Sequence, residues 1–178
     1  VSNSITLTAT VTDGDGDKAS ASIDLGNKLK FHDDAPTVIT NTISTELVVD
    51  ETDLTINATQ DFSGAFTVST GADGGTTAYT LGVSGLGADS GVIDTATGHK
   101  VYLYLENGEV VGRVGDANGA NPSGAIAFKV TVDAATAEVT LDQQRALEHN
   151  DPSDHDDVVS LVSNSITLTA TVTDGDGD

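Results

Sequence analysis

Five residues, Asp13-Gly14-Asp15-Gly16-Asp17, place three carboxylates at every second position, separated by glycines that have no side chain. Calcium accepts about six to eight oxygen ligands in irregular geometry, so this flexible run can wrap around one calcium ion, whereas magnesium requires a stricter octahedron. The spacing resembles the first three ligands of an EF-hand, but Lys18 stands where that loop needs glycine, and strand-like sequence flanks the run. We therefore predict a calcium-binding turn that is not an EF-hand; the alternative is an acidic hairpin tip without metal.

Three carboxylates cannot complete the coordination shell of calcium, so further oxygen ligands must come from nearby segments. Two acidic pairs offer them: Asp33-Asp34, directly before Ala35-Pro36, and Asp50-Glu51, in a predicted turn. If these pairs close the site, the ion lies where one domain meets the next and stiffens that joint. The alternative for each pair is an ordinary solvated turn, in which the carboxylate bonds to its own backbone.

A second acidic cluster combines two histidines with four aspartates: His149, Asp151, Asp154, His155, Asp156 and Asp157. Histidine and carboxylate together would suit zinc, but the segment lacks the fixed helical spacing of a His-Glu-x-x-His motif, so a solvated loop is the favoured interpretation. The sequence holds neither a Gly-x-Ser-x-Gly nucleophile turn nor a glycine loop of the phosphate-binding type. We predict that the protein is not an enzyme and takes no small-molecule substrate.

The acidic run belongs to a longer segment that the chain contains twice. Residues 162–178 repeat residues 1–17 letter for letter, with an offset of 161 residues from Val1 to Val162. The repeat supplies Asp174, Asp176 and Asp178 as further candidate calcium ligands. A period of this length suits a complete domain and not a solenoid unit, so we predict a tandem array whose partners are neighbouring repeats of the same polypeptide.

The elements that must position these residues are β-strands. Before the acidic run, Ile5, Leu7, Ala9 and Val11 alternate with threonines, which predicts a half-buried strand with Leu7 in the core. Residues 19–25 resume the alternation as the return strand of a hairpin. Further short strands are predicted over residues 37–42, 47–49, 54–58, 65–70, 78–83, 101–105, 109–114, 126–132 and 137–141.

Turn signals connect these strands. The strongest is Asn107-Gly108, which predicts a two-residue hairpin. Residues 85–98 and 115–124 are predicted loops, and only residues 142–148 have helical composition, enough for about two turns. Short strands with frequent turns and almost no helix predict an all-β protein, an antiparallel β-sandwich.

Composition narrows the function classes. The chain of 178 residues carries 28 acidic and 7 basic residues, a formal net charge of −21, which excludes ordinary nucleic-acid binding and disfavours direct contact with an anionic membrane. Cysteine is absent, so divalent cations are the obvious candidate for stabilising links in place of disulfides. No apolar run approaches the roughly 20 residues of a membrane helix, and no signal peptide is visible.

Several motifs together resemble the long repeats of bacterial RTX adhesins, giant type I-secreted surface proteins. They are Thr-Val-Thr-Asp-Gly-Asp-Gly-Asp (10–17), Ala-Ser-Ala-Ser-Ile-Asp-Leu (19–25), Phe-His-Asp-Asp-Ala-Pro (31–36), Leu-Val-Val-Asp-Glu-Thr (47–52) and Gln-Arg-Ala-Leu-Glu-His (144–149). The resemblance covers nearly the whole chain. It implies an immunoglobulin-like β-sandwich that acts as an extender domain, projecting an adhesive tip from the cell for adhesion and biofilm formation, with calcium stiffening the array.

The resemblance also implies which residues bind calcium. The family's aspartates carry over onto Asp13, Asp15 and Asp17, their copies Asp174, Asp176 and Asp178, and the pair Asp33-Asp34. The glycine-rich calcium-binding nonapeptides of such proteins do not occur in these residues. Secretion and an extracellular location on the bacterial surface are therefore expected from the resemblance alone.

The repeat frame has two interpretations. In the preferred one, residues 1–33 are the closing strands of a preceding repeat with its joint, and residues 34–178 are a sandwich that lacks its last strand. In the other, residues 1–161 form one unit. Residues 18–31 could complete a sheet in the same or in a neighbouring molecule. The function predicted is a calcium-stabilised spacer; the alternative is a calcium-dependent carbohydrate-binding module, which the small number of aromatic residues disfavours.

Overall fold

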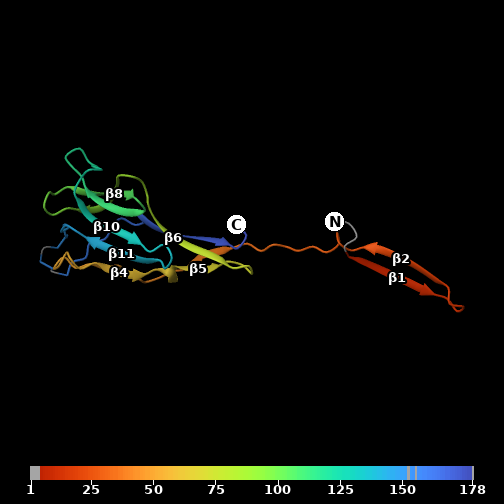
Figure 1. Cartoon of the computed structure of the whole chain (residues 1–178). Helices are drawn as coiled ribbons and strands as arrows, with labels where there is room; N and C mark the ends of the chain where they lie inside the picture. The colour runs from red at the N-terminus through yellow and green to blue at the C-terminus, as the bar shows by residue number, and fades with distance from the viewer. Residues whose placement is uncertain (1–4, 152, 155, 178) are drawn as a thin grey trace. The chain divides into compact units, whose positions relative to one another are not determined.

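The computed structural model describes residues 5–151, 153–154 and 156–177, and its contacts divide the chain into two units, Val1–Asp34 and Ala35–Asp178 (Figure 1). The first unit is an antiparallel ribbon of β1 (Thr6–Thr12) and β2 (Lys18–Asp24). The acidic run forms the turn between them: the Asp13 amide donates to the Asp17 carbonyl at 3.0 Å, and Gly16 has φ +102°. The predicted hairpin is confirmed.

The second unit contains one large antiparallel sheet. Its strand order is β4 (Ala58–Asp61), β11 (Glu138–Gln143), β10 (Ile126–Val132), β9 (Glu109–Val114), β8 (Lys100–Glu106) and β7 (Ala88–Ile93). The connection from β8 to β9 is the predicted Asn107-Gly108 turn, in which both residues take positive φ, 53° and 87°. Positive φ at both central positions is what a two-residue hairpin of this kind requires, and glycine and asparagine tolerate it best.

Two antiparallel ribbons complete the second unit. One pairs β6 (Gly75–Val83) with β12 (Ile166–Asp174), and the other pairs β3 (Thr37–Thr40) with β5 (Phe66–Ser69), which follows a short 3₁₀ turn at Ser63–Ala65. The Phe66 ring of β5 lies 5.8 Å from the Tyr79 ring of β6. The two ribbons therefore pack against each other.

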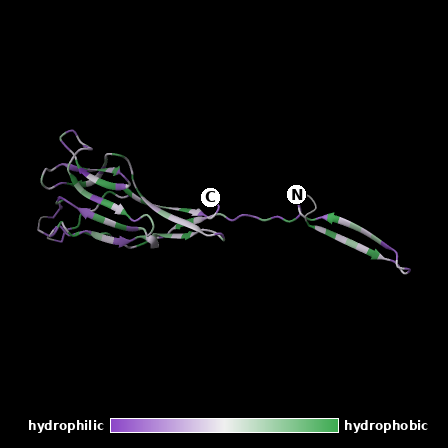
Figure 2. Ribbon diagram, in the orientation of Figure 1, coloured by the Kyte–Doolittle hydropathy of each residue, from purple (hydrophilic) through white to green (hydrophobic). Residues whose placement is uncertain are grey.

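The core lies between the large sheet and the β6–β12 ribbon. Its buried members come mainly from β8, β9 and β10: Val101, Leu103, Val110, Val114, Ala127, Phe128 and Val130. Leu81 of β6 joins them, and Ile166 and Leu168 of β12 pack against them. Hydrophobic and hydrophilic residues alternate along the strands, as expected when one face of each strand is buried (Figure 2). The all-β class and the antiparallel sandwich are confirmed.

Four local predictions are wrong: one of a helix, one of a loop and two of strands. Residues 142–148 form no helix: β11 runs to Gln143, and the following segment pairs with residues 93–95 through the Thr95 amide to the Ala146 carbonyl and the Glu148 amide to the Ile93 carbonyl. These tertiary bonds override helix propensity. The predicted loop at residues 85–98 contains β7. The predicted strand 47–49 is not formed, and of the predicted strand 54–58 only Ala58 belongs to a strand, as the first residue of β4.

The two copies of the repeated segment have different surroundings. In β1, which pairs with β2, Leu7 is 57% exposed and Val11 is 69% exposed. In β12 their copies Leu168 and Val172 are half-buried, and Leu168 packs against the core. The prediction that Leu7 is a core residue is therefore wrong for the first copy, while its sequence twin Leu168 occupies the predicted environment.

Candidate metal-binding site

Three carboxylates meet where β12 ends. Asp73, Asp174 and Asp176 each offer an oxygen, and these oxygens all lie within 4.8 Å of one another. Calcium–oxygen distances are about 2.3–2.6 Å, so ligands on opposite sides of one ion are separated by roughly 5 Å. The three oxygens thus fit around a single calcium ion, and all are the hard donors that calcium prefers.

Strand pairing brings these residues together although Asp73 is far from the other two in sequence. Asp174 is the partner of Gly75 in the β6–β12 register, so the turn before β6 lies beside the acidic run after β12. Two glycines permit the approach. A Cβ on Gly75 would lie 2.2 Å from the Thr173 carbonyl oxygen, and one on Gly175 would lie 2.8 Å from the Asp73 carbonyl oxygen.

The electrostatics of this cluster favour a cation. Asp174 is only 6% exposed, whereas Asp73 and Asp176 are exposed, and the Gly177 amide donates to Asp174 Oδ1 at 2.9 Å. Three carboxylates this close together concentrate negative charge, which a bound divalent cation would balance.

The first copy forms a second, more open cluster of Asp13, Asp15 and Asp17, all of them exposed. Asp13 Oδ1 accepts the amides of Gly16 at 3.1 Å and Asp17 at 2.9 Å. Hydrogen bonding to the Asp15 side chain, followed by the Asp17 amide, holds the pKa of Asp13 below its ordinary value. Asp13 is therefore a carboxylate, and a potential ligand, throughout the neutral range.

The two clusters differ in whether a second part of the chain contributes to them. A Cβ on Gly14 would meet nothing within 4 Å, whereas its copy Gly175 faces Asp73. The same sequence is therefore an exposed hairpin turn in the first unit and one side of a composite cluster in the second. Sequence reasoning missed Asp73, whose only signal is an acidic residue in a glycine-rich turn (Gly-Ala-Asp-Gly-Gly, residues 71–75).

The other predicted calcium ligands are not gathered in these clusters. Asp33 and Asp34 are exposed in the irregular segment after β2, and within the part of the chain that the structure describes they belong to neither cluster. Asp50 Oδ1 accepts the Thr52 amide at 2.8 Å, and bonding to Thr52, first through its side chain, lowers the pKa of Asp50. Asp178 lies outside the described residues.

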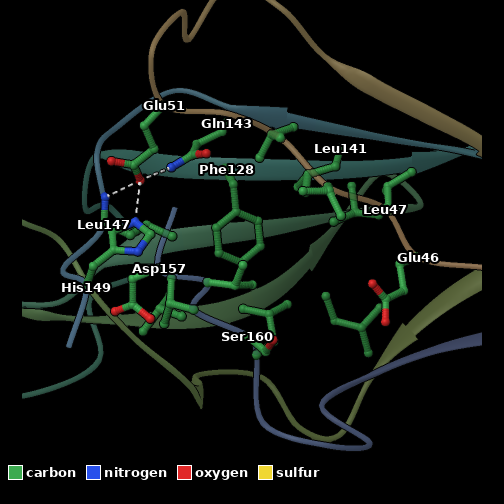
Figure 3. Close-up of a pocket in the computed structure, with 18 residues that line it drawn as sticks. Glu46, Leu47, Glu51, Phe128, Leu141, Gln143, Leu147, His149, Asp157 and Ser160 are labelled. Carbon is green, nitrogen blue, oxygen red and sulfur yellow. Dashed lines mark hydrogen bonds and ion pairs between the residues drawn. The ribbon is translucent and has the colours of Figure 1, made fainter. Parts of the chain in front are cut away.

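Glu51 has a structural role instead. Its Oε1 accepts Gln143 Nε2 at 2.5 Å and the Leu147 amide at 2.8 Å, and His149 Nε2 lies 3.6 Å away (Figure 3). These bonds tie the irregular segment after β3 to the segment after β11. Glu51 thus stands at the rim of a cavity and not beside an Asp-Gly-Asp turn.

That cavity, of about 550 Å³, is lined mainly by aliphatic side chains around Phe128 (Figure 3). Sugar-binding sites usually present exposed aromatic rings for stacking. The chain's three tyrosines do not serve this purpose: Tyr79 is buried against Phe66, and Tyr102 and Tyr104 are half-buried. No observation favours the carbohydrate-binding alternative.

The histidine-containing segment forms local turns. Asp151 Oδ1 accepts the Ser153 amide and hydroxyl, Asp154 Oδ1 accepts the Asp156 amide, and Asp157 Oδ2 accepts the Asp151 amide. His155 lies outside the described residues. Among those described, these carboxylates join no group of three potential metal ligands, so the zinc alternative receives no support.

Comparison with known proteins gives one match. The model of a family described as a domain of unknown function, DUF5801, matches residues 46–178, which include Asp73, Asp174 and Asp176. No curated protein and no solved structure matches the chain. Within the described residues, no helix has both the length and the apolar character needed to cross a membrane.

Proposed function

The chain belongs to the DUF5801 family, and we propose that this member is a calcium-stabilised structural extender: one repeat of a large bacterial surface adhesin. Such a repeat would lie outside the cell and project a ligand-binding tip for adhesion and biofilm formation. Its partners are neighbouring repeats of the same polypeptide. The proposal rests on the exact repetition of residues 1–17 at 162–178 and on the resemblance of the chain's motifs to those of RTX adhesins.

One observation carries the calcium part of the proposal: Asp73 joins Asp174 and Asp176 although it precedes them by about a hundred residues. An ion held by these three would fasten the turn before β6 to the end of β12. That end leads directly into the acidic run of the repeated segment. Calcium would therefore reduce the freedom of the chain at this end of the sandwich, where the acidic run begins.

Thermal unfolding in calcium and in EDTA tests this function. A ligand that binds only the folded state stabilises it by about 2.7 kcal/mol at 100 times its Kd, which for a sandwich of this size corresponds to a rise in Tm of roughly 5–15 °C. Asp73→Asn and Asp176→Asn should each abolish most of this rise. Asp15→Asn removes the same charge from the same sequence context in the first unit and should leave the rise intact.

An equal Tm in calcium and EDTA for the unmodified chain would refute the calcium site. The spacer role needs a separate measurement on a chain of several repeats. Small-angle scattering should give a larger maximum dimension in calcium than in chelator, while far-ultraviolet circular dichroism reports β-structure in both. Equal dimensions would show that calcium does not stiffen the array.

A further inference from the structure

The two copies of the repeated segment form their backbone hydrogen bonds through opposite edges of the strand: the residues of β1 that bond to β2 are not the ones whose copies in β12 bond to β6. In the first unit the Leu25 amide donates to the Ile5 carbonyl at 2.9 Å, and the Asp13 amide donates to the Asp17 carbonyl at 3.0 Å. Backbone direction alternates along a strand, so Leu7, Ala9 and Val11 also direct their amides and carbonyls to β2. The register agrees, because Leu7 pairs with Ile23 and Ala9 with Ala21.

In β12 the other set of alternate residues forms the backbone hydrogen bonds with the partner strand. The Ser84 amide donates to the Ser165 carbonyl at 2.9 Å, whereas the Tyr79 amide points away from its partner Ala170, to the Ala134 carbonyl. Alternation then assigns the backbone bonds with β6 to the threonines of β12: Thr167, Thr169, Thr171 and Thr173. Leu168, Ala170 and Val172 direct their amides and carbonyls to the opposite edge. These are the copies of the residues that bind β2 in the first unit.

We propose that the edge of β12 opposite β6 is the docking site for the strand Lys18–Asp24 of a second copy of this repeat. The complete sheet would then have β12 as its central strand, with β6 on one side and the docked strand on the other. The register of β1 and β2 fixes the pairs: Leu168 faces Ile23 of the second copy, and Ala170 faces Ala21 of the second copy. The proposal rests on the tandem repeat of the proposed function, but not on calcium.

Side chains on both faces fit this arrangement. On the outer face of the first unit, Thr8 and Ser22 hydroxyls lie 2.7 Å apart and those of Thr10 and Ser20 lie 2.9 Å apart. The copies of these threonines, Thr169 and Thr171, are exposed on β12. A docked strand would restore the same two hydroxyl bonds.

On the opposite face of the strands, which carries the aliphatic side chains, apolar surface is exposed. Ile23 is 59% exposed in the first unit. In the second unit, Val38 and Val68 pair across the β3–β5 ribbon and are 44% and 39% exposed, on the face that they share with Phe66. This ribbon lies against β12 as well as β6. A strand added beside β12 would bring its alanines and Ile23 onto this face.

A second copy is the occupant that the sequence specifies. Any extended peptide can add to an exposed strand edge, but β12 contains the whole sequence of β1. The partner of β1, Lys18–Asp24, therefore matches β12 in its backbone hydrogen-bonding positions, in its row of hydroxyls and in its apolar face. The acidic run that turns β1 into β2 also follows β12. In an array, the next residues of the polypeptide would therefore turn back into this edge.

The test is to extend the full chain after Asp178 with the sequence of residues 18–34. The matched control carries the same extension with Ala19→Pro and Ala21→Pro, which removes amides that face β12 in the proposed register. Hydrogen exchange of the Leu168, Ala170 and Val172 amides should slow at least about tenfold, equivalent to about 1.4 kcal/mol, in the first protein only. Unchanged exchange, or equal slowing in the control, would overturn the proposal.

A crosslink tests the register. The chain has no cysteine, and Thr10 faces Ser20 at a position without backbone bonds, where the Cα atoms of antiparallel strands approach most closely. Thr171→Cys should therefore form a disulfide with Ser20→Cys in the extension, and much less with Ser22→Cys. The reverse preference would refute the register. Both experiments are run in calcium and in EDTA, so failure of the calcium site alone leaves their expected outcome unchanged.

Discussion

Leu7 and Leu168 provide an internal comparison that tests the division of the chain into two units. They occupy the same position in identical sequences, yet Leu7 is 57% exposed and Leu168 is half-buried against the core. Leu7→Ala and Leu168→Ala give proteins of the same composition and net charge. Any difference in their stability therefore arises from the surroundings of the two side chains.

The expected magnitudes follow from burial. Replacing a fully buried leucine by alanine costs about 2.7–5 kcal/mol, so the half-buried Leu168 should cost roughly 1.5–3 kcal/mol in the free energy of unfolding of the sandwich. Leu7→Ala removes mostly exposed surface on a separate ribbon and should cost the sandwich less than about 0.5 kcal/mol. With a urea m-value of about 1–3 kcal/mol/M, the Leu168 variant should lose on the order of 1 M in its unfolding midpoint.

The assay is urea unfolding followed by tyrosine fluorescence. All three tyrosines lie in the second unit and tryptophan is absent, so the signal reports the sandwich without a contribution from the first unit. The slope of the transition must stay the same in both variants for the midpoints to be compared. Equal loss of midpoint in the two variants would show that the first copy is packed as the second is, and would refute the division of the chain.

Two further predictions concern the sandwich. Gly175→Ala should lower its Tm and weaken calcium binding, because the new Cβ would lie 2.8 Å from the Asp73 carbonyl oxygen, while the matched Gly14→Ala should leave both unchanged in calorimetry. Asp94→Asn should cost roughly 3 kcal/mol in urea unfolding, because the fully buried Asp94 pairs with Arg145 at 2.7 Å. The hydrogen bond from Arg145 holds the pKa of Asp94 below its ordinary value, so this stabilisation is present above about pH 4 and is lost as pH falls through the folded-state pKa. The difference between the Asp94→Asn variant and the unmodified chain should therefore shrink as the pH falls below about 4, and a difference that grew with falling pH would contradict this account.

Local sequence signals predicted those elements whose geometry depends on neighbouring residues. The alternation before Asp13, the glycine-containing acidic turn and the Asn107-Gly108 hairpin are examples, because each is determined by side-chain direction or by a required positive φ. The segment 142–148 was predicted wrongly because its structure depends on residues that are distant in sequence. Its helix-forming residues bond instead to the segment 93–95, which is far away in sequence.

The candidate metal cluster shows the same limit. Asp174 and Asp176 could be predicted because the spacing of the acidic run is itself the signal. Asp73 could not, because its approach depends on the nine-residue register between β6 and β12, which no local pattern encodes. The repetition of residues 1–17 does not determine exposure either, because the exposure of each copy is set by the strands that lie beside it.

The acidic run has two roles in the proposed array, and they act at the same place. It would supply calcium ligands together with Asp73, and it would also be the turn that returns the chain to the edge of β12 opposite β6. In the first unit this turn is closed by a backbone hydrogen bond of 3.0 Å from the Asp13 amide to the Asp17 carbonyl, without a residue from another turn. In the second unit the equivalent turn lies against Asp73. An ion bound there would hold the start of the returning strand beside β12, so it would lower the entropic cost of docking that strand. Calcium binding and completion of the sheet should therefore be positively coupled: each should increase the affinity or stability of the other by the same factor, as linkage requires.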